Sequence, residues 1–292
     1  QIKASPRMKS SFALAAAYTF ILSALKMPSV AGSSSHLTGT TLGTLTIGPM
    51  AMPLVGAIVL LFQALLLAHG GISTLGANIF SLSIAGPFVA YALFRLLTSA
   101  RLPKSLVIFI ATFCGSMATY IVTSFQLAVV YPDAVTGVMG AAWKFLGIFA
   151  ITQVPLSIIE GILTVIVLRL LEKSQAKTAT SVKASSTQSS TKSSLRPQFI
   201  WLSILAVVCL ALPILAGLFD IGAGTDDQAG EMIGRLTPGF NPTPFLESFE
   251  PSEFAEPLLF ALQVAIGIAL FAWGYYQLIY KRHQSKQKEQ EA

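Results

Sequence analysis

Charged residues are scarce in this sequence of 292 residues: they make up 11% of it, whereas hydrophobic residues make up 53%. Soluble domains carry about 25% charged residues, so the composition excludes an ordinary soluble globular protein. The apolar runs also lack the alternating polarity of barrel strands, which argues against a transmembrane β-barrel. Runs of membrane-spanning length recur through the chain, and its mean hydropathy is +0.69. The sequence therefore predicts an all-α, polytopic helical membrane protein.

Catalytic motifs are missing as well. Cys114 and Cys209 stand singly within apolar runs, where cysteine behaves as a small buried hydrophobe. The chain contains neither the GxxxxGKS/T loop of nucleotide hydrolases nor the HExxH pair of zinc proteases, so we expect no enzymatic activity of its own. A membrane metalloenzyme, in which Glu160 acts with His36 or His69, is kept as a remote alternative.

The charges that are present predict an orientation in the membrane. The net charge is +6, and the basic residues lie in short segments between the apolar runs, a pattern that the positive-inside rule explains better than nucleic-acid binding does. Eight of the 13 acidic residues fall in one loop, 220–256. We therefore expect a cell-membrane protein with a cytoplasmic C-terminus, and with this acidic loop and His36 outside.

Six apolar runs are predicted to cross the membrane before residue 173, and two after residue 197. They are 12–26, 41–50, 52–68, 75–97, 104–131 and 143–171, followed by 198–219 and 257–280. The run 41–50 would measure only ~15 Å as a helix, about half of the hydrocarbon core. It is therefore predicted to be tilted and broken, or not to be a true span.

A stretch rich in Ser, Thr and Lys divides the chain. Residues 174–197 are predicted to form a disordered linker. A membrane domain, 1–173, precedes the linker, and a two-span unit, 198–282, follows it and contains the external acidic loop 220–256. The last residues, 283–292, are a cytoplasmic tail. The loop also carries Phe245 and Phe249 among several prolines, a composition that predicts docking on the external face near His36.

Two polar features interrupt the apolar sequence of the membrane domain. His36 stands in AGSSSHLTGTT, where hydroxyl groups and an imidazole between spans suit the binding of something small, although an ordinary exposed loop is the alternative. Glu160 lies deep in the run 143–171 and needs a partner or a water cavity. It either bonds Gln153 or a hydroxyl at a helix contact, or takes part in coupling or gating.

Five segments, in order, closely resemble the CbiM family of substrate-capture components of energy-coupling-factor cobalt transporters. They are LKMPSVAGSSSHLTGTTLG, LLFQALLLAHGGISTLGANIFS, GPFVAYALFRLL, ATYIVTSFQLAVVYPD and KFLGIFAITQVPLSIIEGILTVIV. FDIGAGTDDQAGEMI and PLLFALQVAIGIALF resemble CbiN, the two-span companion. The resemblance implies a CbiM–CbiN fusion that imports Co²⁺ for corrinoid (cobalamin) synthesis, driven by a transmembrane coupling subunit and paired cytoplasmic ATPases. A nickel (Ni²⁺) importer of the same class is the alternative.

The resemblance also implies the metal site. In this family a Met-His N-terminus and the loop histidine that corresponds to His36 hold the metal. This sequence begins at Gln1 without the Met-His segment and the family's first span, so only His36 is carried over as a metal ligand. One imidazole does not hold Co²⁺ or Ni²⁺ selectively, because these ions favour several nitrogen donors. We expect the transported ion to be a substrate, with no permanently bound cofactor.

Other residues are predicted to support this site or to dock a partner. Those that could orient the imidazole or support it from behind are Ser33, Ser34, Ser35, Thr38, His69 and Asn78. Ala13 and Ala17 form a small-xxx-small pair on the first run, which serves close helix approach. This pair either docks the coupling subunit or packs within the chain.

Overall fold

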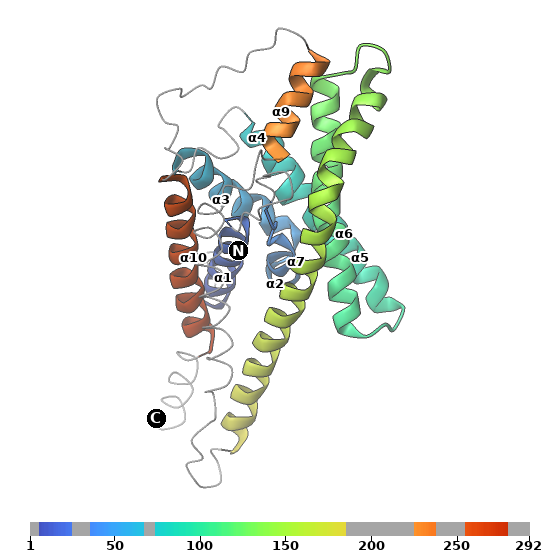
Figure 1. Cartoon of the computed structure of the whole chain (residues 1–292). Coiled ribbons are helices and arrows are strands. Elements are labelled where there is room, and N and C mark those ends of the chain that lie inside the picture. The colour runs from blue at the N-terminus through green and yellow to red at the C-terminus, as the bar shows by residue number, and fades with distance from the viewer. Residues whose placement is uncertain (1–5, 25–35, 67–73, 185–224, 238–254, 280–292) are drawn as a thin grey trace.

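The computed structural model describes residues 6–24, 36–66, 74–184, 225–237 and 255–279. All regular elements in these residues are helices (Figure 1): α1 (Pro6–Ser23), α2 (Thr40–Ile47), η1 (Pro49–Ala51), α3 (Met52–Leu66), α4 (Leu75–Asn78), the π-helix η2 (Ile79–Ala85), α5 (Gly86–Ser99), α6 (Lys104–Val130), α7 (Gly137–Ala184), α9 (Thr225–Leu236) and α10 (Ala255–Ile279). The predicted all-α membrane architecture is confirmed.

Among the described residues, three helical segments are long and apolar enough to cross a membrane. They are Leu75–Ser99, which joins α4, η2 and α5, Lys104–Val130, which is α6, and Gly137–Lys173 within α7. Thr40–Ile47 and Pro49–Leu65 pass the same test only as a pair, and they are bent by 119° at the break between them. The run 41–50 is therefore broken from the helix that follows it.

The bent pair α2–α3 leaves and returns at the same end of α1. Gly39, immediately before α2, packs against Leu22 near the end of α1. At the far end of α3, the side-chain amide of Gln63 donates a hydrogen bond of 2.9 Å to the hydroxyl of Ser23. Because both ends lie beside the last turn of α1, the pair is re-entrant, and 41–50 is not a crossing of its own.

Helix α7 extends further than the sequence analysis predicted. It runs from Gly137 to Ala184, so the first part of the linker predicted at 174–197 is helical. No Gly or Pro occurs between Lys173 and Ala184 to end the helix. The rest of that linker, and the span predicted at 198–219, lie outside the described residues. The span predicted at 257–280 corresponds to α10, a helix of 25 residues that includes the apolar stretch Ala261–Gly274.

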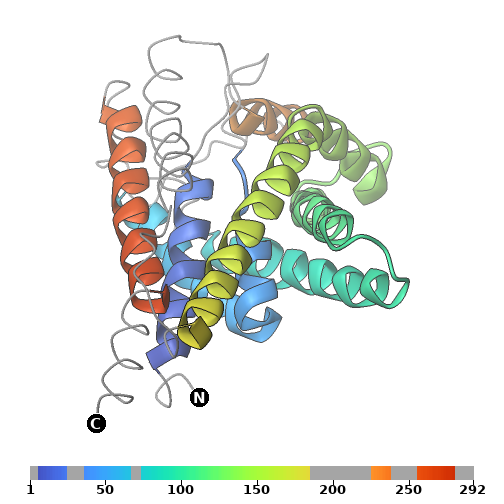
Figure 2. The same ribbon diagram turned by 90° about the horizontal axis from the view of Figure 1, so that it is seen from below.

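Helix α10 packs along α1 on one side of the molecule, away from α5 and α6 (Figure 2). Gly267 faces Ile21, and Gly274, two turns later, faces Leu14. The missing side chains at these two glycines let the helices approach closely. Because positions rise along α10 as they fall along α1, the two helices are antiparallel.

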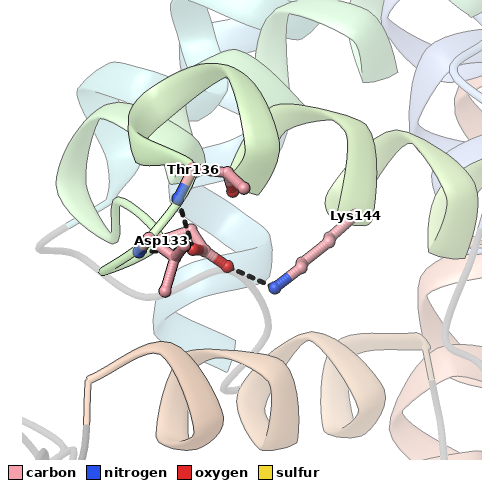
Figure 3. A network of polar contacts seen from close by, with 4 residues as sticks. Asp133, Thr136 and Lys144 are labelled. Atoms are coloured by element: carbon pink, nitrogen blue, oxygen red, sulfur yellow. Dashed lines mark hydrogen bonds and ion pairs between the residues drawn. The ribbon is translucent and has the colours of Figure 1, made fainter.

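Helices α6 and α7 form an antiparallel pair whose connection is fixed by Asp133 (Figure 3). One carboxylate oxygen, Oδ1, accepts hydrogen bonds of 2.8 Å from the N–H groups of Val135 and Thr136. The other oxygen, Oδ2, forms an ion pair with Lys144. The Lys144 ammonium, followed by the two backbone N–H groups, holds the pKa of Asp133 well below its ordinary value. Asp133 thereby ties the connection to the N-terminal part of α7 through Lys144.

Candidate metal centre

Residues 36–39, which we call the His36 loop, lie between α1 and the α6–α7 pair. At one end, the Tyr120 hydroxyl donates a hydrogen bond of 2.7 Å to the His36 carbonyl. At the other end, the Thr19 hydroxyl donates a hydrogen bond of 3.1 Å to the Gly39 carbonyl. Side chains of α6 and α1 therefore satisfy the backbone carbonyls at both ends of the loop.

The imidazole of His36 is oriented by the next residue of the chain. Its Nδ1 lies 3.0 Å from the backbone carbonyl oxygen of Leu37. A carbonyl only accepts hydrogen bonds, so Nδ1 carries a proton. In the neutral ring the lone pair is then on Nε2, which is the nitrogen that can bind a metal. Metal-binding histidines commonly donate their other ring N–H to a carbonyl in this way.

A buried carboxylate holds the second half of the His36 loop. Glu160 lies in α7 and is 0% exposed. Its Oε1 accepts hydrogen bonds from the Thr38 hydroxyl (2.6 Å) and from the Gly39 N–H (2.9 Å). Its Oε2 accepts hydrogen bonds from the Thr38 N–H (2.8 Å) and from the Ser116 hydroxyl (3.2 Å). Glu160 thus ties the loop to both α6 and α7.

Glu160 has the hydroxyl partners that were one of its two expected roles, but it does not bond Gln153. Neither polar atom of the buried Gln153 side chain forms a hydrogen bond within the part of the chain that is described. Thr38, which was predicted to orient the imidazole, directs its hydroxyl to Glu160 instead. The physical reason is that a buried carboxylate must collect donors.

Gly39 is required by both its conformation and its surroundings. Its φ is +66°, in the left-handed region that favours glycine. A Cβ at this position would lie 2.9 Å from the Cα of Thr19. Glycine therefore lets the loop lie directly on α1 while its N–H points to Glu160.

The other predicted site residues are only partly within the described chain. Asn78 lies in α4, where its amide donates a hydrogen bond of 3.3 Å to the Thr74 hydroxyl. Ala17 is fully buried, and its carbonyl oxygen lies beside Gly267 of α10, whereas Ala13 is half-buried. The prediction for Ser33, Ser34, Ser35 and His69 lies outside the described residues.

Helix α9, which comes from the acidic loop, packs against the parts of α6 and α7 that adjoin their connection (Figure 1). The partly buried residues of α9 in this contact are Met232, Ile233 and Leu236. They join a cluster that contains the buried Phe145 and Phe149 of α7 and the half-buried Tyr120 of α6. The Tyr120 ring lies 6.2 Å from the Phe149 ring, centroid to centroid. The same tyrosine therefore contacts this cluster and bonds the His36 carbonyl.

The sequence analysis missed Tyr120, because a tyrosine in an apolar run has many ordinary explanations. The spacing of Met232, Ile233 and Leu236 was visible as one helical face, although it stands among acidic residues. Within the described residues, no group of three His, Cys, Asp or Glu side chains is arranged to hold a metal. His36 thus supplies one donor, and a complete coordination sphere needs others.

Comparisons with known proteins identify the family of the chain. The family described as "Cobalt uptake substrate-specific transmembrane region", CbiM, matches residues 2–178, and the "Cobalt transport protein component CbiN" matches residues 194–291. The cobalt transport protein CbiM of Acetoanaerobium sticklandii is 56% identical over 171 residues, which are 59% of this chain and 70% of the relative. Cobalt transport protein CbiM 2 of Pelobacter propionicus is 55% identical over 171 residues, covering 59% of this chain and 76% of the relative.

A solved structure shares the fold of part of the chain. The crystal structure of a truncated transition metal transporter is 28% identical to this chain, with a TM-score of 0.50, over 58% of this chain and 83% of that chain. The family is a transport component and not an enzyme. The chain belongs to the CbiM family of cobalt uptake transmembrane components and carries a CbiN component on the same polypeptide.

Proposed function

We propose that this protein captures Co²⁺ at the outer face of the cell membrane through His36, and that a transmembrane coupling subunit and paired cytoplasmic ATPases drive its release inward. The observation that carries the proposal is the geometry of His36. Its Nδ1 hydrogen bond to Leu37 leaves the lone pair on Nε2, and Tyr120 fixes its backbone. A ligand held in this way is oriented before the metal arrives.

The capture site needs donors beyond His36. Co²⁺ favours several nitrogen ligands, so one imidazole binds it weakly. Ser33, Ser34, Ser35 and His69 stay predictions for its surroundings, whereas the Thr38 hydroxyl bonds Glu160 and the Asn78 amide bonds Thr74. The imported cobalt would supply corrinoid synthesis.

The orientation follows from the charges at the helix ends. Lys9 lies in the first turns of α1, and the basic residues near the junction of α5 and α6 are Arg95, Arg101 and Lys104. Positively charged ends favour the cytoplasm. Helix α1 crosses once, and with the re-entrant pair in place of two crossings only Leu75–Ser99 crosses between α1 and Arg101. Two crossings return the chain to its starting side, so Lys9 and Arg101 stay on the same side. The orientation in the membrane is therefore proposed as the sequence predicted it, for the membrane domain 1–173, the C-terminal unit 198–282 and the cytoplasmic tail 283–292.

For Ala13 and Ala17, the alternatives were docking of the coupling subunit and packing within the chain. Ala17 packs against α10 within the chain, which favours internal packing for this residue. Ala13 is half-buried and stays the candidate of the pair for contact with the coupling subunit.

Uptake of radioactive cobalt by cells tests the site. The variant His36→Ala, made in the full-length protein with its partner subunits, should lose uptake, because it removes a direct ligand. His69→Ala should only weaken uptake, and His283→Ala in the tail serves as the control. Uptake by His36→Ala with an unchanged dependence on Co²⁺ concentration would remove His36 from the site. Competition by Ni²⁺ in the same assay measures the choice between the two metals.

A further inference from the structure

We propose that Glu160 is a positioning residue for cobalt capture: its carboxylate holds Thr38 and Gly39 so that His36 is presented to the metal in one fixed geometry. This inference rests on the proposed role of His36. It assigns to the carboxylate a part in metal affinity, although Glu160 itself does not touch the metal.

The hydrogen bonds of Glu160 require an acceptor oxygen at both carboxylate positions. Each oxygen receives one backbone N–H: Oε1 receives that of Gly39, and Oε2 receives that of Thr38. A backbone N–H can only donate. An amide in place of the carboxylate would therefore turn its NH₂ group toward one of these two N–H groups, whichever way it was rotated. Glutamine has almost the same shape as glutamate but cannot make this set of bonds.

The place of these bonds in the chain connects them to the metal ligand. Thr38 and Gly39 stand two and three residues after His36, so the loop has little freedom between the ligand and the clamp. Glu160 is 122 residues from Thr38 in the sequence, and its fourth bond reaches Ser116 of α6. The carboxylate therefore fixes the loop to two membrane helices and not merely to itself.

The surroundings argue against a simple space-filling or ion-pair role. None of the ion pairs formed by described residues includes Glu160. A fully buried carboxylate is costly unless hydrogen bonds satisfy it, and here most of the bonds come from the His36 loop. An apolar residue would fill the same space without that cost. The buried carboxylate is therefore explained by the loop it holds.

The test measures cobalt uptake against Co²⁺ concentration in cells that carry the full-length protein and its partner subunits, with rates divided by the amount of protein in the membrane. Glu160→Gln should raise KM by about 10- to 100-fold, the usual effect of losing a group that orients a metal ligand. The maximal rate per molecule should fall much less, because a high cobalt concentration compensates for poor presentation of His36. Glu172→Gln on the same helix, whose partner is Lys104 at the other end of the α6–α7 pair, should leave both values unchanged.

A matched pair at Thr38 tests the same clamp from the loop side. Thr38→Val keeps the shape but removes the hydroxyl that bonds Oε1, and it should raise KM in the same direction as Glu160→Gln. Thr38→Ser keeps the hydroxyl and should restore the wild-type affinity. If Glu160→Gln fails to accumulate in the membrane, the two Thr38 variants still show whether the bond between Thr38 and Glu160 affects KM.

Two results would overturn the proposal. One is a wild-type KM for Glu160→Gln with only a lower amount of protein or a lower melting temperature, which is what a purely structural residue gives. The other is equal behaviour of Thr38→Val and Thr38→Ser. Failure of the proposed function is distinguishable, because His36→Ala would then keep its wild-type KM whatever the Glu160 variants do.

Discussion

The packing of α9 on the α6–α7 pair leads to a quantitative prediction. Ile233 and Leu236 are half-buried and contact the cluster that contains Phe145 and Tyr120. The double change Ile233→Ser and Leu236→Ser removes apolar contact from α9 while leaving α6 and α7 intact. We expect α9 to detach more often, and the support of the His36 carbonyl by Tyr120 to loosen with it.

The size of the effect follows from the buried area. Full burial of an Ile or Leu side chain contributes about 1.5–3 kcal/mol, so a half-buried one contributes roughly 1 kcal/mol. The two substitutions together should weaken docking by about 2 kcal/mol, which is close to 30-fold in the docking equilibrium. Cobalt uptake at low Co²⁺ should fall, and high Co²⁺ should restore part of it.

Limited trypsin digestion reads the docking equilibrium directly. Arg235 lies in α9 with a side chain that is 73% exposed, and cleavage after it requires the helix to open. Where opening is fast compared with cleavage, the cleavage rate follows the open population, so it should rise by about 30-fold. The comparison is the triple variant Asp226→Asn, Asp227→Asn and Glu231→Gln, which removes three negative charges of the acidic loop. Because charges in water are screened beyond ~8 Å, this variant should reduce uptake less than the double Ser variant does. If the triple variant loses uptake and the Ser variant does not, the loop acts by collecting cations and not by docking.

Two further predictions concern the helix connection and the orientation. Asp133→Asn keeps an acceptor for the N–H groups of the connection but loses the ion pair to Lys144, whereas Asp133→Ala loses both, so melting temperatures should fall in the order wild type, Asn, Ala. The folded-state pKa of Asp133 lies below its ordinary value of 3.8. Its contribution to folding stability is therefore complete above pH 3.8 and disappears as the pH falls toward the folded-state pKa. A difference in melting temperature between wild type and Asp133→Asn that is unchanged at pH 2 would contradict the ion pair. For the orientation, cysteines placed at Ser35 and Ser248 in a background without Cys114 and Cys209 should react with an impermeant maleimide on whole cells, and cysteines at Ser186 and Ser285 only after lysis; reaction at Ser186 before lysis would reverse the proposed sides.

The features that the sequence predicted well are those that depend on local composition. The apolar runs predicted membrane helices because their length and hydropathy are properties of contiguous residues. The break near residue 48 was also foreseeable: Gly48 and Pro49 are adjacent, a pair that marks turns, and Gly48 adopts a φ of +91°. That the broken pair returns to its starting end was not predictable, since this depends on Gln63 meeting Ser23.

The candidate site shows the same division between local and distant causes. A lone carboxylate in an apolar run indicated that Glu160 needs a partner. The partner itself, 122 residues away in the sequence, is set by tertiary packing that no local pattern encodes. The contact between Thr38 and Glu160 was not predicted for this reason: the nearness of Thr38 to His36 in sequence suggested the imidazole, whereas its hydroxyl bonds Glu160.

The C-terminal unit contacts the membrane domain on both sides of the His36 loop. Helix α10 packs on α1, the helix that precedes this loop in the chain, and α9 packs on α6 and α7, which hold residues 36–39 by hydrogen bonds. Neither contact touches the imidazole in the described residues. The C-terminal unit packs on the helices that hold the His36 loop, so it can stabilise one geometry of this loop. It does so without occupying the space that a metal bound to His36 would need. Fusion favours this arrangement further, because it raises the effective concentration of the C-terminal unit at the membrane domain.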